Sequence, residues 1–172
     1  MLCHALLRFP VVVALMTLAV ATSTSPAYVL EFPGPQPGKA AARLEDNRLV
    51  FENDVIAATW TLGRGGFRLT EVVDKISPGA VRAGPGEAFV ITFADGLSLN
   101  ASNMLPAEKP TIERLQPAPG AAALSTRFAG WKATVPLVSP DGRLRAQWHA
   151  TLRDGANYIR QELALGAQEK EA

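Results

Sequence analysis

Frequent glycine and proline residues are the feature that most restricts what this chain can fold into. After residue 30, few segments longer than ten residues lack both of them. Long helices are disfavoured because proline breaks a helix interior and glycine weakens it, whereas short segments between such breaks suit β-strands. The sequence therefore predicts an all-β domain, an antiparallel β-sandwich of short strands joined by turns.

The segment 143–153 has the clearest strand pattern. Five apolar residues alternate along it with polar ones: Leu144, Ala146, Trp148, Ala150 and Leu152. This period of two predicts a strand with one buried face. A helix is the alternative, because Leu144, Trp148 and Leu152 are also spaced by four. Asp-Gly pairs at 141–142 and 154–155 mark turns at both ends and favour the strand.

Further strands are predicted wherever β-prone residues lie between turn signals. The predicted ranges are 48–51, 55–62, 67–73, 88–93, 97–101 and 111–115, a weaker one at 122–128, and 157–165, where a helix is again the alternative. Glycines at 63–66 and the Asp95-Gly96 pair predict two hairpin turns. Prolines make 105–120 a predicted loop, and Pro136 and Pro140 predict a further turn.

The N-terminus has the organisation of a secretory signal peptide. A start with one fixed positive charge, Arg8, precedes the apolar segment 9–21, which contains Pro10 and ends in Ala-Val-Ala. A membrane-spanning helix needs about 20 apolar residues, so this shorter segment favours a cleaved signal over an anchor. We expect a signal peptide at 1–21 and a secreted or periplasmic protein that is free of the membrane after cleavage.

The rest of the chain is expected to form a linker and one domain. Residues 22–43 include Pro33, Pro35 and Pro37 with neighbouring glycines, a composition typical of an extended linker. Residues 44–172 are the predicted β-sandwich domain. This length is enough to bury a core without disulfides.

Charge and cysteine content exclude several functions. The chain has 17 Lys and Arg against 16 Asp and Glu, and loss of Arg8 with the signal leaves 16 of each (17 minus one). This balance, without a basic cluster, argues against nucleic acid as a partner. The one cysteine, Cys3, lies in the expected signal, so we expect neither disulfides nor thiol catalysis in the processed protein.

Few residues of the sequence could carry catalysis. Histidine occurs only at His4 and His149, and His4 leaves with the signal, so a His-rich metal site is excluded. His149 lies on the polar face of its predicted strand, which favours a solvated side chain over a catalytic one. The glycine-rich segment 63–66 joins two predicted strands and does not open a helix, unlike a phosphate-binding loop. We predict no catalytic residue, no metal and no cofactor.

The acidic residues divide into turn positions and strand positions. Asp74, Asp95, Asp141 and Asp154 occupy predicted turns, where a structural role is the default. Glu71 and Glu162 lie in predicted strands and are stronger candidates for a site. Arg160 falls on the same strand face as Glu162, so the two side chains can also simply pair with each other.

Aromatic residues supply the remaining candidates. Trp60 and Trp148 lie in apolar strand patterns and are predicted to be core residues. Trp131 follows Ala-Gly near a loop, and is the better candidate for stacking on a sugar. The candidate substrate-binding residues are Trp131, Asn157, Tyr158, Arg160 and Glu162.

Four segments carry a resemblance to a known family. They are ENDVIAATW at 52–60, FRLTEVVDK at 67–75, GEAF at 86–89 and LRDGANYIRQEL at 152–163. Together they resemble the N-terminal β-sandwich of secreted, α-galactosidase-like glycoside hydrolases. The resemblance implies a galactose-mutarotase-like supersandwich fold, strands in the C-terminal segment and a carbohydrate-related ancestry.

The same resemblance implies that catalytic residues are missing from this sequence. In such enzymes a supersandwich of about 250 residues precedes a (β/α)-barrel, whose carboxylates perform the hydrolysis. The present sequence ends at Ala172, so the resemblance implies a sandwich that is incomplete at its C-terminus. The expected function is that of a non-catalytic fragment of a secreted carbohydrate-active protein, with carbohydrate as its partner.

The alternative is an exported interaction module. If 157–165 is a strand at the edge of its sheet, its free main-chain groups can pair with another chain. Under this interpretation we expect self-association through the C-terminal edge strand.

Overall fold

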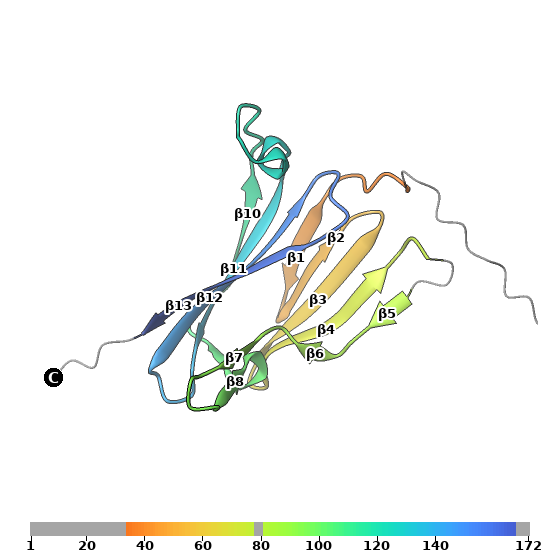
Figure 1. The fold of residues 1–172 in the computed structure, drawn as a ribbon. Helices are drawn as coiled ribbons and strands as arrows, with labels where there is room; N and C mark the ends of the chain where they lie inside the picture. Colours follow the sequence, from red (N-terminus) through yellow and green to blue (C-terminus); the bar gives the residue numbers. More distant parts are fainter. Residues whose placement is uncertain (1–33, 78–80, 168–172) are drawn as a thin grey trace, which may run out of the picture. The chain divides into compact units, whose positions relative to one another are not determined.

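A computed structural model describes residues 34–77 and 81–167, and these residues form an all-β fold (Figure 1). Two main antiparallel sheets and one small hairpin contain the strands. The predicted all-β class is thus confirmed. The expected signal peptide at 1–21 and the first part of the expected linker lie outside the described residues. No helix within the described ranges is long and apolar enough to cross a membrane.

The first sheet has the strand order β1-β2-β3-β4-β5, and β6 also pairs with β4. Its strands are β1 (Ala41–Glu45), β2 (Arg48–Glu52), β3 (Ile56–Gly63), β4 (Gly66–Asp74), β5 (Val81–Ala83) and β6 (Gly86–Glu87). Neighbouring strands are antiparallel, and Gly63 pairs with Gly66 at the predicted β3–β4 hairpin. β1 starts at Ala41, three residues before the start that the sequence predicted.

The second sheet has the order β10-β11-β12-β13, and β9 pairs with β11. Its strands are β9 (Leu105–Pro106), β10 (Thr111–Leu115), β11 (Gly130–Val138), β12 (Leu144–Arg153) and β13 (Arg160–Ala167). Between the two sheets in sequence lie the hairpin β7 (Val90–Thr92) and β8 (Ser98–Asn100), and the 3₁₀ turn η1 (Ala101–Asn103); a second 3₁₀ turn is η2 (Leu124–Arg127). Gly96 has a φ of 85° in the predicted Asp-Gly turn between β7 and β8, a conformation that glycine readily adopts.

The core forms where the inner faces of the two sheets meet. Every second residue of β12 from Ala146 to Leu152 is buried, which confirms the predicted alternation. Trp148 lies 5.0 Å from Trp60 and 4.8 Å from Phe67, measured between ring centroids. Both tryptophans predicted to be core residues are therefore buried, with exposed fractions of 0% for Trp60 and 1% for Trp148.

Hydrogen bonds join the two sheets at one end. The backbone N–H of Gly155 donates to the carbonyl of Gly38 (2.8 Å), and the N–H of Ala40 donates to Oδ1 of Asp154 (2.9 Å). The side-chain amide of buried Asn53 donates to the carbonyl of Ala156 (2.7 Å). We call these six residues the polar clasp; it fixes the chain before β1 against the turn between β12 and β13.

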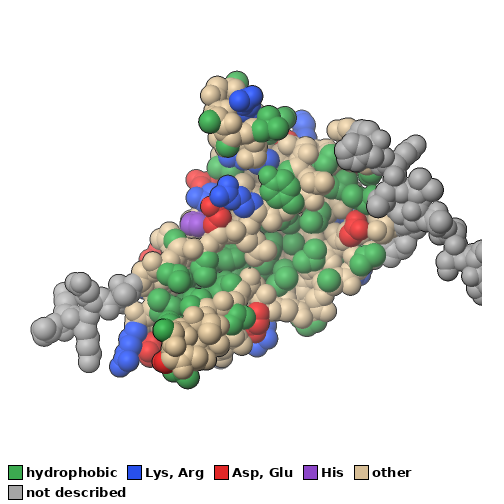
Figure 2. Space-filling view, in the orientation of Figure 1, with side chains coloured by type: hydrophobic (Ala, Val, Ile, Leu, Met, Phe, Trp, Pro, Cys, Tyr) green, Lys and Arg blue, Asp and Glu red, His purple; other side chains and the backbone are tan. Residues whose placement is uncertain are grey.

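The two sheets are closed along one side and open along the other. β1 packs against β10 and β11, and β9 packs against β3 and β4. On the opposite side, β13 ends the second sheet, and hydrophobic side chains gather over the face between β13 and strands β4 to β6 (Figure 2). There Leu163 and Phe89 are only partly buried against the core.

Two predictions in the middle of the chain were wrong. The strand predicted at 122–128 is absent, and Leu124–Arg127 forms the 3₁₀ turn η2 instead. The second error concerns β11, the strand that pairs with β12 over the greater length. The sequence did not predict β11, because Pro136 lies within it.

The position of Pro136 explains how a central strand tolerates proline. Its carbonyl accepts a hydrogen bond from Ala107 (2.9 Å), so its nitrogen also points towards β9 and β10 and away from β12. On that side β10 pairs only as far as Thr134 and β9 begins opposite Leu137. The missing N–H therefore falls in the gap between β9 and β10, where no ladder bond is lost.

Candidate functional site

A hollow of about 200 Å³ lies on the outer face of the second sheet, near its η2 end. Strands β10 to β13, η2 and the β12–β13 connection all contribute to it. Its lining residues are Leu115, Ser125, Thr126, Lys132, Thr151, Arg153, Ala156, Tyr158, Arg160 and Glu162. Most of these side chains are polar or charged, so the hollow suits a ligand rich in hydrogen-bonding groups.

Strand register explains why these side chains meet. Lys132 of β11 lies opposite Thr151 of β12, and Thr151 lies opposite Arg160 of β13. Because alternate residues of a strand point to opposite faces, neighbours of buried residues such as Leu152 face outwards. One row across three adjacent strands thus supplies three polar side chains to one side of the hollow.

Charged groups in the hollow are partly paired with each other. Nη2 of Arg160 lies 2.9 Å from Oε1 of Glu162, the pairing that the sequence suggested. Nη1 of Arg153 donates to the carbonyl of Phe128 (2.6 Å). Lys132 is 3.7 Å from Glu113, a long contact between half-exposed groups, so its ammonium can donate to a ligand.

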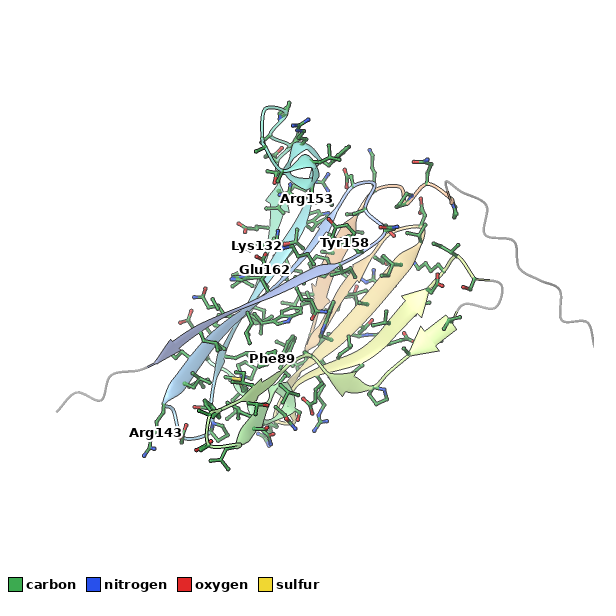
Figure 3. All side chains as sticks on the ribbon, in the orientation of Figure 1. Phe89, Lys132, Arg143, Arg153, Tyr158 and Glu162 are labelled. Carbon is green, nitrogen blue, oxygen red and sulfur yellow. The ribbon has the colours of Figure 1, made fainter. Side chains whose placement is uncertain are left out.

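Tyr158 adds an aromatic ring to this polar surface. It lies in the connection between β12 and β13, and 52% of its surface is exposed. Figure 3 shows Tyr158 near Lys132, Arg153 and Glu162 on one side of the sheet, whereas Arg143 lies at the far end. An exposed ring beside donors and an acceptor can contact both the apolar and the polar parts of a ligand.

His149 lies in the next row of the same face, between Thr134 and Glu162. Its Nδ1 is 2.9 Å from Oγ1 of Thr134. Burial lowers the pKa of His149 and the nearby Lys132 lowers it further, while Glu162 and Glu113 act in the opposite direction. The imidazole is partly exposed and lies on the polar outer face of β12, where the sequence placed it.

The structure brings together three of the five candidate residues. Tyr158, Arg160 and Glu162 line the hollow. Asn157 lines a different hollow, of about 230 Å³, beside Val55 and Asp74.

Trp131 also lies away from the hollow. Its position opposite buried Leu152 places it on the inner face of the second sheet. The indole Nε1 donates to the carbonyl of Ala40 (3.1 Å), and the guanidinium of Arg114 lies 5.1 Å from the ring centroid. Trp131 therefore helps to hold the chain before β1, and its ring is not a platform beside Tyr158.

Sequence reasoning missed Lys132, Thr151 and Arg153. Lys132 belongs to β11, the strand that was not predicted because it contains Pro136. The alternation of Trp131, Ala133 and Val135 with polar Lys132 and Thr134 was a usable signal, because it continues on both sides of the lysine with a period of two.

Within residues 34–77 and 81–167, the acidic side chains outside the hollow have structural partners in several cases. No group of three or more His, Cys, Asp or Glu side chains there could hold a metal ion. Asp74, Asp95 and Asp141 accept backbone N–H bonds in their turns, as predicted. Glu71, the other strand candidate, pairs with Arg82 (2.6 Å).

Comparison with known proteins gives no match. No family model matches the chain, and no curated protein or solved structure is significantly similar to it.

Proposed function

We propose that this chain is a non-catalytic carbohydrate-binding β-sandwich of an exported, carbohydrate-active protein. The observation that carries the proposal is the hollow on the outer face of the second sheet, where Tyr158, Arg160 and Glu162 meet Lys132 and Thr151. The resemblance of four sequence segments to the N-terminal domain of α-galactosidase-like glycoside hydrolases supports it. In this proposal the galactose-mutarotase-like sandwich binds sugar and does not itself hydrolyse it.

The chemistry of the hollow suits a sugar ring. Sugar hydroxyls donate and accept hydrogen bonds, and the hollow offers donors on Lys132, Thr151 and Arg160 and an acceptor on Glu162. The exposed ring of Tyr158 can pack on the C–H face of a pyranose. The hollow has a volume of about 200 Å³, below the range of about 300–1,000 Å³ that is usual for sites of drug-sized ligands. It therefore has room for one sugar unit.

Charge in the hollow favours one class of sugar. Lys132, Arg153 and Arg160 are cationic, and Glu162 is the one carboxylate that lines it. A sugar that carries a carboxylate is therefore expected to bind more tightly than its neutral counterpart, and the difference should shrink as salt is added. Galacturonate and galactose provide this comparison.

Titration followed by NMR tests the proposal. Addition of galactose or galacturonate should shift the backbone amide signals of Lys132, Thr151, Tyr158 and Glu162 in a saturable manner. We expect Tyr158→Ala to weaken binding up to about tenfold, equal to about 1.4 kcal/mol, the upper range for one aromatic contact. Arg143→Gln is the matched control, because Arg143 is 81% exposed and lies far from the hollow (Figure 3).

Two results would contradict the proposal. Saturable signal shifts only at residues outside the hollow, or no signal shifts with either sugar, would show that the hollow is not a sugar-binding site. Turnover of aryl α-galactosides that persists through purification, and is lost in Glu162→Gln but kept in Arg143→Gln, would show that the chain is catalytic.

A further inference from the structure

β13 is the longest strand at any outer edge of the two main sheets in the described part of the chain. It has 8 residues, whereas β1 and β10 have 5 each and β5 has 3. Natural edge strands are usually protected by being short, by lysine or proline, or by a bulge. β13 contains neither lysine nor proline, its two charged residues, Arg160 and Glu162, pair with each other on the outer face of the sheet, and its pairing with β12 is regular.

Hydrogen bonds of β12 determine which groups of β13 are free. Ser139 donates to the carbonyl of Leu144 (2.9 Å), and Asp154 donates to that of Ala129 (2.8 Å), so even-numbered residues of β12 bond to β11. Odd-numbered residues of β12 therefore bond to β13, through its residues 160, 162, 164 and 166. The N–H and C=O groups of Gln161, Leu163 and Leu165 point outwards, and no described residue pairs with them.

The side chains of these three residues lie on the inner face of the sheet. Leu163 pairs with buried Trp148 and packs against the core, while Leu165 is 52% exposed. Phe89, across the open side, is also only partly buried (Figure 3). Free main-chain groups and an incompletely covered apolar layer thus occur together at one edge.

We infer that a second copy of this chain docks on β13 by antiparallel pairing of the two strands about Leu163. In this register Leu163 faces Leu163 of the second copy, and Gln161 faces its Leu165. All outward N–H and C=O groups of the three residues are then bonded in both copies. The inner side chains of the added strand extend the apolar layer opposite the first sheet and cover the face that is open in one copy.

The spacing and charge of β13 favour its own copy as the occupant. A twofold axis through Leu163 brings the same surface of both copies together, as closed dimers require. Arg160 then lies opposite Gly166 of the second copy and Glu162 opposite Ala164, so no like charges face each other. One of the two neighbouring registers would place Glu162 against Glu162 and is disfavoured. This inference does not rest on sugar binding, because the hollow is on the other face of the sheet.

Hydrogen exchange and light scattering test the docking. The mass measured by light scattering should rise from one copy to two with protein concentration. At low concentration the amides of residues 160, 162, 164 and 166 should be protected and those of Gln161, Leu163 and Leu165 should exchange. At high concentration the latter three should become protected as well, which gives an alternating pattern that pairing at another surface would not produce.

Variants separate docking from folding. Leu165→Pro removes an N–H that bonds to no other described residue, so the far-ultraviolet circular dichroism spectrum should be kept while the dimer is lost. Leu165→Lys should have the same effect by placing a charge at the edge. Leu124→Lys is the control, because Leu124 is also an exposed leucine (66%) but lies in η2.

Cysteine pairs report the register. With Cys3 replaced by serine, a mixture of Glu162→Cys and Ala164→Cys chains should form a disulfide-linked dimer, whereas Glu162→Cys alone should not. A wild-type chain that stays monomeric at every concentration would overturn the inference. A dimer that survives in both Leu165 variants, or one in which Gln161, Leu163 and Leu165 still exchange, would overturn it too.

Discussion

Trp148 shows how much of this fold depends on single side chains. Its ring contacts those of Trp60 and Phe67, which come from the other sheet, and its Nε1 donates to Oε1 of Gln161 in β13 (3.2 Å). One residue therefore joins the two sheets and the last strand. Removal of such a side chain leaves a cavity that its neighbours can fill only in part.

We predict that Trp148→Ala lowers the free energy of unfolding by about 3–5 kcal/mol. Urea denaturation followed by circular dichroism measures this loss. Leu124→Ala serves as the control, because an exposed side chain should change stability by no more than about 0.5 kcal/mol. Equal effects of the two substitutions would show that Trp148 is not part of a cooperative core.

His149 makes stability depend on pH in one direction. Its pKa is lowered in the folded protein, chiefly by burial and then by Lys132. The unfolded chain, with a histidine pKa of about 6.5, therefore binds a proton at a higher pH than the folded one does. The contribution is fully present above pH 6.5 or so, and is lost as the pH falls through the lower pKa of the folded state.

We predict that the urea concentration at the midpoint of unfolding decreases when the pH is lowered from 7.5 to 5.5. The decrease should be smaller in His149→Gln. Glutamine keeps a polar side chain opposite Thr134 but does not titrate. Hydrogen bonds from Arg43 and Lys75 lower the pKa of Glu52, so the protein also loses stability as the pH falls through the titration of Glu52. That loss occurs at a lower pH than the one caused by His149. A midpoint whose fall is the same in the wild type and in His149→Gln would contradict the role of His149.

Among the elements, two hairpins with similar turns differ in what surrounds them. Gly66 and Gly96 have φ angles of 80° and 85°, which side-chain-bearing residues rarely adopt. A Cβ on Gly96 would meet open space, but one on Gly66 would lie 1.9 Å from the carbonyl oxygen of Ser102. Ser102 is itself held by two hydrogen bonds to Glu87.

We predict that Gly96→Ala costs about 1–2 kcal/mol, the penalty for a left-handed backbone alone. Gly66→Ala should cost at least about 2 kcal/mol more, because the backbone of η1 must also move. Thermal unfolding of both variants provides the comparison. A similar loss in the two would mean that η1 does not pack on the β3–β4 hairpin.

The elements also show what the sequence could predict. β12 was predictable because one buried face gives strict alternation and Asp-Gly turns bound it. β11 was not predictable, because Pro136 was interpreted as a turn signal. The proline is tolerated in this strand only because it lies at the gap between β9 and β10, which the sequence does not reveal. The short strand β9 depends on pairing with β11, and so could not be predicted from its two residues.

The candidate site was predictable only in its C-terminal part. Tyr158, Arg160 and Glu162 lie within one continuous segment, and Arg160 and Glu162 fall on one face of its predicted strand. Lys132 and Thr151 join them through the pairing of three strands, which sequence spacing does not reveal. Trp131 was assigned to the surface because Gly130 precedes it, but Gly130 is the first residue of β11 and is buried.

For the molecule as a whole, export is the property that the sequence predicts most directly. We expect a secreted or periplasmic product whose N-terminus is Thr22, after Ala-Val-Ala, or Tyr28 if cleavage instead follows the Ser-Pro-Ala segment at 25–27. Mass spectrometry of the purified product measures this. Recovery of the chain with Met1 intact in the cytoplasm would contradict the prediction.

The polar clasp has a mechanical consequence. It holds the chain near Gly38 at the end of the two sheets where β13 starts, and β13 then runs along the second sheet to Ala167. Tension between these two points therefore acts along β13 and not across it. Such a load shears β13 along β12. The hydrogen bonds between the two strands must then break together and cannot break one after another. The last strand, which has one free edge, is thus mechanically resistant to a pull along the chain.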